Sequence, residues 1–311
     1  EEDILVSPRD TMRKEDWTHA IRLYQQRTGM KATGKISKDM VDRLNFSNWE
    51  KFKQAALNLD RYKLLPDTMP TQYLWINIPG FSLHLFDHDT IVFISKVVVG
   101  KSTTPTPLLQ SAITNMVTYP QWTIPTSIIV KEIIPGMRKD TAYLEKHGFV
   151  LVNGDGQEVP PRSVNWWKYS KGLPYKVIQG SGDDNALGIL KFNFNNKYSV
   201  YLHDTNQRYL FERTVRALSH GCIRVQQWKK LAFYLLDQDS LSATGTFSTA
   251  DSVRAWLNRK EKHWVPVRNR MPLYVRYFTC DENKGNIKFY NDIYGKDSLL
   301  LNRYYADKPV Q

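Results

Sequence analysis

The segment Tyr73-Leu74-Trp75-Ile76-Asn77-Ile78 begins the part of the chain that decides the fold. Residues 81–86 and 90–94 follow it, and all three segments have the short apolar, β-branched and aromatic pattern of strands. Only Pro79-Gly80 and the polar turn Asp87-His88-Asp89 separate them. Strands this close in sequence indicate antiparallel meanders rather than parallel strands that alternate with helices. We therefore expect a mainly β domain.

Similar patterns extend outward from this segment toward the C-terminus. We expect strands at 97–100, 190–194 and 198–203, helices at 226–236 and 250–258, and a hairpin that pairs 273–277 with 287–290. The stretch from about 105 to 178 mixes proline-rich turns with one helical pattern near 125–134. This mixture predicts an insertion into the sheet.

The N-terminal residues predict a small all-α module. Apolar residues recur at helical spacing in 17–28, 37–44 and 47–64, and Pro66 follows the last of these segments. We therefore expect a helical module and linker helix at 1–68 and a β domain at 69–311.

Composition limits the classes of partner. The 311 residues include 43 Lys and Arg against 31 Asp and Glu, a formal net charge of +12 that favours a polyanionic partner or surface. The basic residues are scattered and no zinc-finger spacing accompanies them, so we expect no nucleic acid partner. No apolar run of about eighteen residues predicts a membrane span. The start, Glu1-Glu2-Asp3-Ile4, resembles neither an initiator methionine nor a signal peptide, so we expect a processed fragment with any anchor upstream.

The strongest chemical signal is Ala217-Leu218-Ser219-His220-Gly221-Cys222-Ile223-Arg224, with His203 upstream of it. A free thiol with a pKa near 8.5 is mostly protonated at neutral pH, so a cysteine becomes a nucleophile only beside a base or a positive charge. His203 is a candidate for that base, because an imidazole can take the thiol proton and return it to a leaving amine. This pair predicts nucleophilic catalysis by Cys222.

Two neighbours of Cys222 suit the same chemistry. Gly221 lets a substrate carbonyl approach the backbone, and consecutive amides there could form an oxyanion hole. Arg224 could hold a substrate carboxylate or brace the loop. Taken singly, each of these residues has an ordinary structural explanation, as a small buried hydrophobe, a satisfied histidine or an ion-paired arginine.

Taken together, Ser-His-Gly-Cys-x-Arg at 219–224 and a histidine nineteen positions before the cysteine resemble the signature of the L,D-transpeptidase (YkuD) catalytic domain. The resemblance extends to 180–182, 185–188 and 201–205, and 75–79 resembles the first strand of that domain. Residues 21–30, 33–36 and 41–45 resemble a small helical peptidoglycan-binding module. The whole arrangement is most similar to the large periplasmic YcbB type of Gram-negative bacteria. It implies a YkuD-like β-sandwich with flanking helices and a capping insertion at about 105–178.

The resemblance also implies a reaction, the formation of 3→3 peptidoglycan cross-links. The cysteine attacks the diaminopimelate carbonyl of a donor tetrapeptide stem, releases D-alanine and holds the stem as a thioester, which the diaminopimelate amine of an acceptor stem resolves. Position by position, catalytic roles fall to Cys222, His203, Gly221 and His220, and substrate-binding roles to Tyr201, Ser219, Arg224, Asp204, Trp166 and Trp167. In the family the histidine is often oriented by the backbone carbonyl just after it, here that of Asp204.

The partners follow from the same resemblance. It implies peptidoglycan tetrapeptide stems as substrates, carbapenem-type β-lactams as covalent inhibitors of Cys222, and other wall synthases as protein partners. No cofactor or metal is expected. The implied location is the periplasm, with membrane contact only through an anchor outside this chain.

Several alternatives stay open from the sequence. The same site could act as an L,D-carboxypeptidase, in which water resolves the thioester, or the chain could be a non-catalytic wall-binding scaffold. A zinc hydrolase would use His203, His220, Cys222 and Cys280 as ligands, although their spacing is unusual for zinc and no His-Glu-x-x-His occurs. A disulfide between Cys222 and Cys280 would disable the nucleophile.

Overall fold

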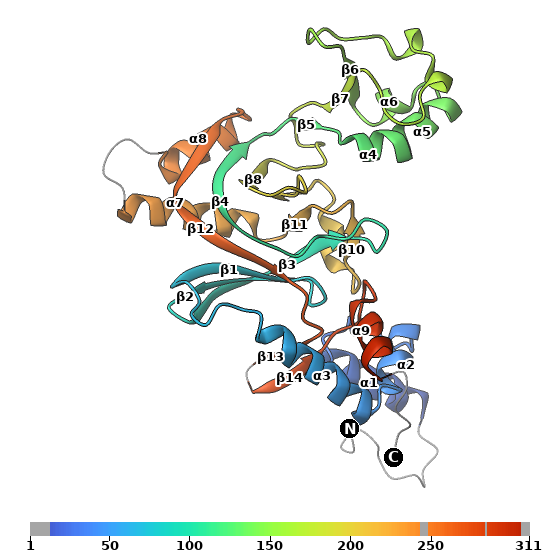
Figure 1. Ribbon diagram of the computed structural model, residues 1–311, viewed down its shortest axis with the longest axis vertical. Helices are drawn as coiled ribbons and strands as arrows, with labels where there is room; N and C mark the ends of the chain where they lie inside the picture. Colours follow the sequence, from blue (N-terminus) through green and yellow to red (C-terminus); the bar gives the residue numbers. More distant parts are fainter. Residues whose placement is uncertain (1–12, 243–247, 284, 306–311) are drawn as a thin grey trace. The chain divides into compact units, whose positions relative to one another are not determined.

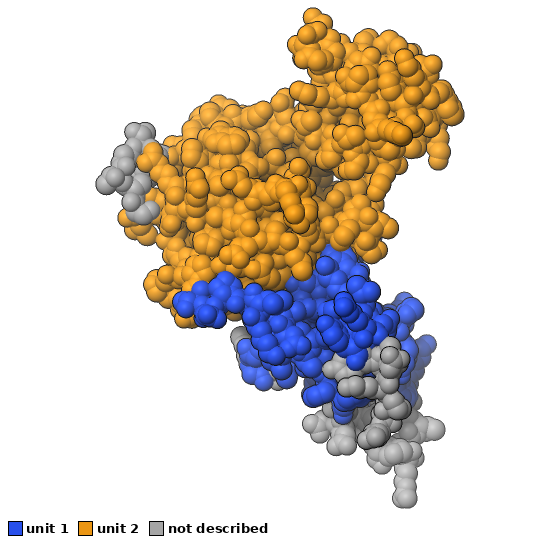
Figure 2. Space-filling model, in the orientation of Figure 1, with its two compact units in different colours: residues 1–68, 212–215, 277–311 blue, residues 69–211, 216–276 orange. Residues whose placement is uncertain are grey.

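The computed structural model describes residues 13–242, 248–283 and 285–305, which form two compact units (Figures 1 and 2). The described residues of the helical unit lie within 1–68, 212–215 and 277–311, and those of the β unit within 69–211 and 216–276. The described residues from Tyr277 to Tyr305 thus group with the N-terminal helices, whereas the sequence analysis assigned this segment to the β domain. Glu1-Glu2-Asp3-Ile4 lies outside the described residues. Within the described ranges, no helix is both long and apolar enough to cross a membrane.

A nine-stranded sheet is the core of the β unit, which confirms the mainly β fold. The strand order is β10-β3-β11-β9-β8-β4-β12-β1-β2, and β2 also pairs with β3, so the sheet closes on itself. Closure pairs the strand edges that an open sheet would expose. The strands are β1 (Gln72–Asn77), β2 (Ser82–Asp87), β3 (Thr90–Gly100), β4 (Leu109–Thr118), β8 (Leu190–Phe194), β9 (Leu202–His203), β10 (Ala217–Ser219), β11 (Ile223–Val225) and β12 (Trp264–Arg276).

Strands β1, β2 and β3 form the antiparallel meander that the sequence predicted. In β2, Leu83 and Leu85 are fully buried, while Ser82, His84 and Phe86 are partly exposed. Alternate side chains of this strand therefore point into the core. Three other pairs, β1 with β12, β9 with β11 and β10 with β3, are parallel. These join segments distant in sequence, and the local patterns did not predict them.

The two longest helices of this unit are α7 and α8. Helix α7 (Trp228–Ser242) buries Leu231 and Leu235 completely. Its buried Asp239 accepts hydrogen bonds from the backbone N–H groups of Arg268 (3.0 Å) and Asn269 (2.7 Å), where the register of β12 shifts. Helix α8 (Ala250–Asn258) begins with a side-chain cap from Thr249. The carboxylate of Asp239 therefore satisfies backbone groups that the bulge in β12 leaves unpaired.

The insertion has its own small sheet and core. Strands β5 (Trp122–Thr123), β7 (Lys176–Gln179) and β6 (Phe149–Val152) pair in that order. The helical segments are α4 (Thr126–Ile128), the π-helix η2 (Ile129–Ile133), α5 (Ile134–Lys139), α6 (Tyr143–Lys146), and the 3₁₀ turns η3 (Pro161–Ser163) and η4 (Trp166–Lys168). A start near residue 105 was wrong, because β4 is a strand of the main sheet that pairs with β8 and β12. The separate fold begins only after Thr118.

The helical unit combines both ends of the chain. It contains α1 (Lys14–Arg27), α2 (Lys38–Leu44), α3 (Asn48–Tyr62), the hairpin of β13 (Cys280–Asn283) and β14 (Asn286–Phe289), and α9 (Lys296–Tyr305). The predicted hairpin of 273–277 with 287–290 was wrong, because Leu273 pairs with Leu74 in β1 and Ile287 pairs with Glu282. Buried Gln25 on α1 holds the turn before α2 through Gly34 N–H (2.9 Å) and the Lys35 carbonyl (2.8 Å).

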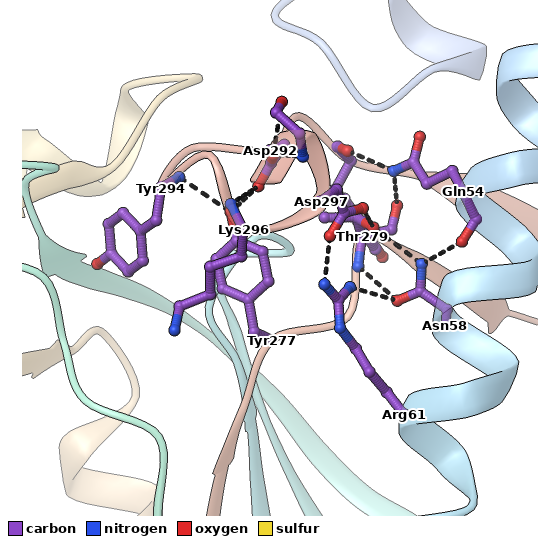
Figure 3. Close-up of polar contacts among 11 residues, drawn as sticks. Gln54, Asn58, Arg61, Tyr277, Thr279, Asp292, Tyr294, Lys296 and Asp297 are labelled. Atoms are coloured by element: carbon purple, nitrogen blue, oxygen red, sulfur yellow. Dashed lines mark hydrogen bonds and ion pairs between the residues drawn. The ribbon is translucent and has the colours of Figure 1, made fainter. Parts of the chain in front are cut away.

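A buried polar network ties α3 to the C-terminal segment (Figure 3). Asn58 Nδ2 donates to Thr279 Oγ1 (2.8 Å), and Asn58 Oδ1 accepts from the Thr279 N–H (2.9 Å). Gln54 Nε2 donates to the Thr279 carbonyl (2.7 Å), while Arg61 and Thr279 both contact the Asp297 carboxylate. Hydrogen bonds of this kind fix one arrangement, because any other would leave buried polar groups unpaired.

We expect Asn58→Ala to destabilise the helical unit by about 2 kcal/mol, because it leaves the buried N–H and hydroxyl of Thr279 short of partners. The matched control is Asp60→Ala on the same helix, which removes only the exposed ion pair with Lys63 and should change little. Urea unfolding followed by circular dichroism gives both values. Equal midpoints for the two variants would show that the network does not stabilise the unit.

Candidate active site

Three adjacent strands bring the candidate residues together. In register, His203 on β9 lies opposite Lys191 on antiparallel β8 and opposite Arg224 on parallel β11. The Ile223 N–H donates to the Tyr201 carbonyl (3.1 Å), which extends the pairing to the residue before β9. Side chains two apart on a strand share a face, and paired residues face the same way. We call these residues the thiol cluster: Lys191, Tyr201, His203, Cys222 and Arg224.

The loop that carries Cys222 is held from both sides. Ser219 Oγ donates to the Cys222 carbonyl (2.6 Å) and accepts from the Gly221 N–H (3.1 Å). Thr106 Oγ1 donates to the Gly221 carbonyl (2.8 Å). Gly221 has a φ of 120°, a conformation that favours glycine. Ser219 and Gly221 thus shape the loop.

The backbone amides of this loop differ in their availability. The Gly221 amide, expected to help form the oxyanion hole, is already occupied by Ser219. The amides of His220 and Cys222 have no hydrogen-bond acceptor within the described ranges. Those two N–H groups are the donors left for a substrate oxygen.

His203 is buried and neutral at ordinary pH. Burial lowers its pKa to about 3, and the positive charges of Arg224 and Lys191 act in the same direction, against backbone contacts with Asp204 and Leu187. Nδ1 contacts the Asp204 carbonyl, the orientation that the resemblance implied. A carbonyl only accepts, so Nδ1 carries the proton and Nε2 is the basic nitrogen.

The Asp204 carboxylate binds structural partners. It accepts from the Ile189 N–H (3.2 Å) and pairs with Arg208 (3.2 Å), and burial raises its pKa. A Cβ on Gly188, at φ +62°, would lie 2.3 Å from Asp204 Oδ2, so glycine is required there. The geometry does not support the expected substrate-binding role of Asp204.

The Cys222 thiol lies between opposing influences. Burial raises its pKa, while contacts with the backbone and side chain of Tyr201 and the positive charges of Lys191 and Arg224 lower it. Sγ also lies 4.0 Å from the Ser199 carbonyl. Burial raises the pKa of Tyr201, and its ring centroid lies 5.7 Å from that of His203. Tyr201 thus stays protonated and its hydroxyl can donate a hydrogen bond.

Arg224 contacts the segment that follows β9. Its Nη1 donates to Gln207 Oε1 (3.0 Å). Its Nε is buried and has no hydrogen-bond partner among the described residues. Of the two roles expected for Arg224, bracing the neighbouring segment is visible here, and the open Nε leaves a donor for a ligand.

His220 and Trp122 connect the site to the insertion. His220 Nε2 lies 2.6 Å from Glu132 Oε1 on the π-helix η2. Trp122 on β5 lies near the Tyr201 side chain and lowers its pKa, although burial dominates the overall rise, and the buried Nε1 of Trp122 makes no hydrogen bond within the described residues. His220 therefore links the cysteine loop to the insertion, and no direct contact of its ring with Cys222 is present in the described structure.

The two tryptophans predicted to bind substrate lie within the insertion. Trp166 is 6% exposed, packs in the insertion core and donates to the Pro161 carbonyl (2.9 Å), so its assignment to substrate binding was wrong. Trp167 is 73% exposed and stacks under Arg138, 5.1 Å from the ring centroid. Neither contacts the thiol cluster in the described structure.

Lys191 is the member of the cluster that sequence reasoning missed. Its Nζ lies 3.9 Å from the centroid of the Tyr201 ring. Its strand alternates buried Leu190, Phe192 and Phe194 with partly exposed residues, a pattern that reads as an ordinary polar face. The alternation along β8 puts Lys191 on the face opposite the buried Leu190 and Phe192. Only its pairing with His203 shows that this face carries the candidate site.

The described structure does not support the zinc or the disulfide alternative. Within the described ranges, no three His, Cys, Asp or Glu side chains converge as metal ligands, so the zinc alternative lacks a ligand set. Cys222 and Cys280 are both free thiols. Cys280 lies in the helical unit, and burial raises its pKa to about 11, which makes it a poor nucleophile.

Comparison with known proteins gives the family. The YkuD model, described as the L,D-transpeptidase catalytic domain, matches residues 71–247. A Haemophilus influenzae protein named "Putative L,D-transpeptidase" is 33% identical over 248 residues, which cover 80% of this chain and 49% of that protein. This chain therefore spans about half the length of that relative.

Solved structures are more distant. An L,D-transpeptidase from Mycobacterium smegmatis is 12% identical, with 66% of this chain and 58% of that chain covered and a TM-score of 0.30. One from Stackebrandtia nassauensis is 13% identical, with 91% and 87% covered and a TM-score of 0.29. Similarities this weak do not support any conclusion about this chain. The family model alone covers more than half of the chain, including the loop around Cys222, so the protein belongs to the L,D-transpeptidase catalytic domain (YkuD) family.

Proposed function

We propose that this chain is an L,D-transpeptidase that forms 3→3 peptidoglycan cross-links through a thioester on Cys222. One observation carries the proposal: a thiol flanked by two cations and two unpartnered amides lies in the same strand pairing as a neutral, oriented histidine. Membership of the family supports the reaction class. We extend the proposal to the YcbB type, with the helical unit as a peptidoglycan-binding module, a periplasmic location and an anchor outside this chain.

In the acylation step, Cys222 Sγ attacks the diaminopimelate carbonyl of the donor stem while His203 Nε2 takes the thiol proton. The carbonyl oxygen becomes an oxyanion, which the amides of His220 and Cys222 can stabilise together with the Tyr201 hydroxyl. Collapse of the tetrahedral intermediate breaks the bond to D-alanine, and the imidazolium returns its proton to the leaving amine. A thioester and free D-alanine result.

In the transfer step, the side-chain amine of an acceptor diaminopimelate attacks the thioester carbonyl. His203 takes a proton from that amine and gives it to the departing Cys222 sulfur, which restores the thiol. Water in place of the amine would give the carboxypeptidase reaction instead. The contact of Glu132 with His220 supports a role for the insertion in excluding water from the reaction.

We expect intact-protein mass spectrometry to show one covalent adduct when the chain is incubated with a carbapenem, because the strained ring carbonyl presents the same electrophile to Cys222. Cys222→Ala should show no adduct, and Cys280→Ala, the matched control, should behave like the unmodified chain. With disaccharide-tetrapeptides, cross-linked dimers should form only where Cys222 is present.

Three results would contradict the proposed transpeptidase activity of Cys222. Tripeptide without dimers would indicate a carboxypeptidase. Neither adduct nor product from folded protein would favour a wall-binding scaffold. An adduct that persists in Cys222→Ala would show that another residue is the nucleophile.

Buried, neutral His203 should also make the β unit sensitive to acid. Its pKa is lower in the folded chain than in the unfolded chain, so the unfolded state binds the extra proton as pH falls from about 6.5 toward 3. His203 should therefore remove about 1.4 kcal/mol of stability for each pH unit within that window and have no effect above it. Urea unfolding at several pH values measures this slope.

The variant His203→Gln should lose this part of the slope, while His147→Gln, which removes an exposed histidine of the same unit, should keep it. Other groups also contribute to each slope, so the difference between the two slopes isolates the contribution of His203. Equal slopes for the two variants would mean that His203 has the same pKa in the folded and unfolded chains, which would contradict its burial as a neutral imidazole.

A further inference from the structure

We propose that Lys191 supplies the positive charge that stabilises the Cys222 thiolate and so sets the pH range in which the thiol reacts. The inference rests on the proposed role of Cys222 as nucleophile and adds a residue that the Cys222 motif does not contain. Lys191 acts on the thiolate through space, as a positioning charge.

Three strands determine where the ammonium lies. Lys191 is opposite His203 in the pairing of β8 with β9, and Cys222 lies beside Tyr201 at the start of the pairing of β9 with β11. Lys191 Nζ lies over the Tyr201 ring, 3.9 Å from its centroid, and Tyr201 contacts the thiol. A cation over an aromatic face is held by the ring's quadrupole. The ammonium is therefore held against the Tyr201 ring.

The ammonium has no carboxylate partner. Lys191 is half-buried, and none of the described carboxylates lies within ion-pair distance of it. Its neighbour on the other side is Val117 of β4, which carries no charge. A partly desolvated cation without a counter-ion costs free energy. Such a cost indicates a functional reason for lysine at this position.

The counter-charge can come only from Cys222 among the titratable groups of the cluster. His203 is neutral or positive, Arg224 is positive, and burial raises the pKa of Tyr201 so that its hydroxyl stays protonated. The Asp204 carboxylate is engaged by Arg208 and the Ile189 amide. When Cys222 gives up its proton, its sulfur becomes the negative group that Lys191 otherwise lacks.

Arg224 is the second cation, but its position differs. Its guanidinium is tethered to Gln207 on the segment after β9. The Lys191 ammonium makes no hydrogen bond or ion pair within the described residues beyond its contact with the Tyr201 ring, so its charge is not already paired when the thiol ionises. Burial lowers the pKa of Lys191 and Cys222 raises it, the reciprocal of the effect of Lys191 on the thiol.

The test is the rate at which iodoacetamide alkylates Cys222 in the full chain, followed against pH by mass spectrometry of the Cys222 peptide. Lys191→Met keeps the length of the side chain and removes its charge. We expect its thiol to titrate about one pH unit higher, with alkylation at pH 7 about tenfold slower. Lys191→Arg should restore the original profile, because it keeps the charge.

Lys197→Met is the matched control, since Lys197 also lies over a tyrosine ring, 5.4 Å from the centroid of exposed Tyr198, but outside the cluster. It should leave the profile unchanged. Lys191→Gln gives a second neutral variant if the methionine variant fails to fold. An unchanged profile in a folded neutral variant would overturn the inference, as would a rise in KM for the donor stem alone, which would assign Lys191 to substrate binding.

Alkylation needs no peptidoglycan, so it separates this inference from the proposed function. A shifted profile together with cross-linking by the unmodified chain supports both. A shifted profile without any cross-linked product would remove the transpeptidase proposal and leave the role of Lys191 toward the thiol intact.

Discussion

The parallel pairing of β9 with β11 is the constraint on which the site depends. It sets Leu202 beside Ile223 and His203 beside Arg224, and thereby brings Cys222 next to Tyr201. A slip of one residue would turn every one of these side chains to the opposite face of the sheet. The loop between the two strands is anchored at its start by the buried Asp204 carboxylate and at its end by Ser219 and Thr106. Register and loop anchors together determine the position of the sulfur.

This pairing also gathers like charges where a folded protein would normally avoid them. Lys191 and Arg224 flank a buried imidazole, and both disfavour its protonation. The same two charges favour a thiolate at Cys222. The cluster therefore keeps its histidine neutral and partly offsets the rise that burial causes in the pKa of its cysteine, at a cost in stability that a core of apolar residues would not have. Strained or desolvated groups of this kind are typical of catalytic sites.

The sequence predicted what depends on local pattern. The strands of the β1–β2–β3 meander and the helices of the N-terminal segment follow from periodicity. It did not predict the parallel pairs, because these form between segments whose separation no local pattern encodes. Lys191 was missed because its alternating strand is typical of an ordinary polar face, and only its register with His203 in the antiparallel pairing of β8 with β9 places it at the site. Trp166 was misassigned because adjacent tryptophans suit a core as well as a binding surface.

The insertion illustrates how a local irregularity can serve a distant group. Glu132 lies on the π-helix η2, where one extra residue per turn widens the helix and changes the direction of its side chains. That turn contains the carboxylate that contacts His220, whose backbone amide is one of the two left open beside Cys222. A regular α-helix through 129–133 would rotate Glu132 relative to its neighbours. The π-turn is thus part of what holds the cysteine loop, and a change in the insertion would reach Cys222 through His220.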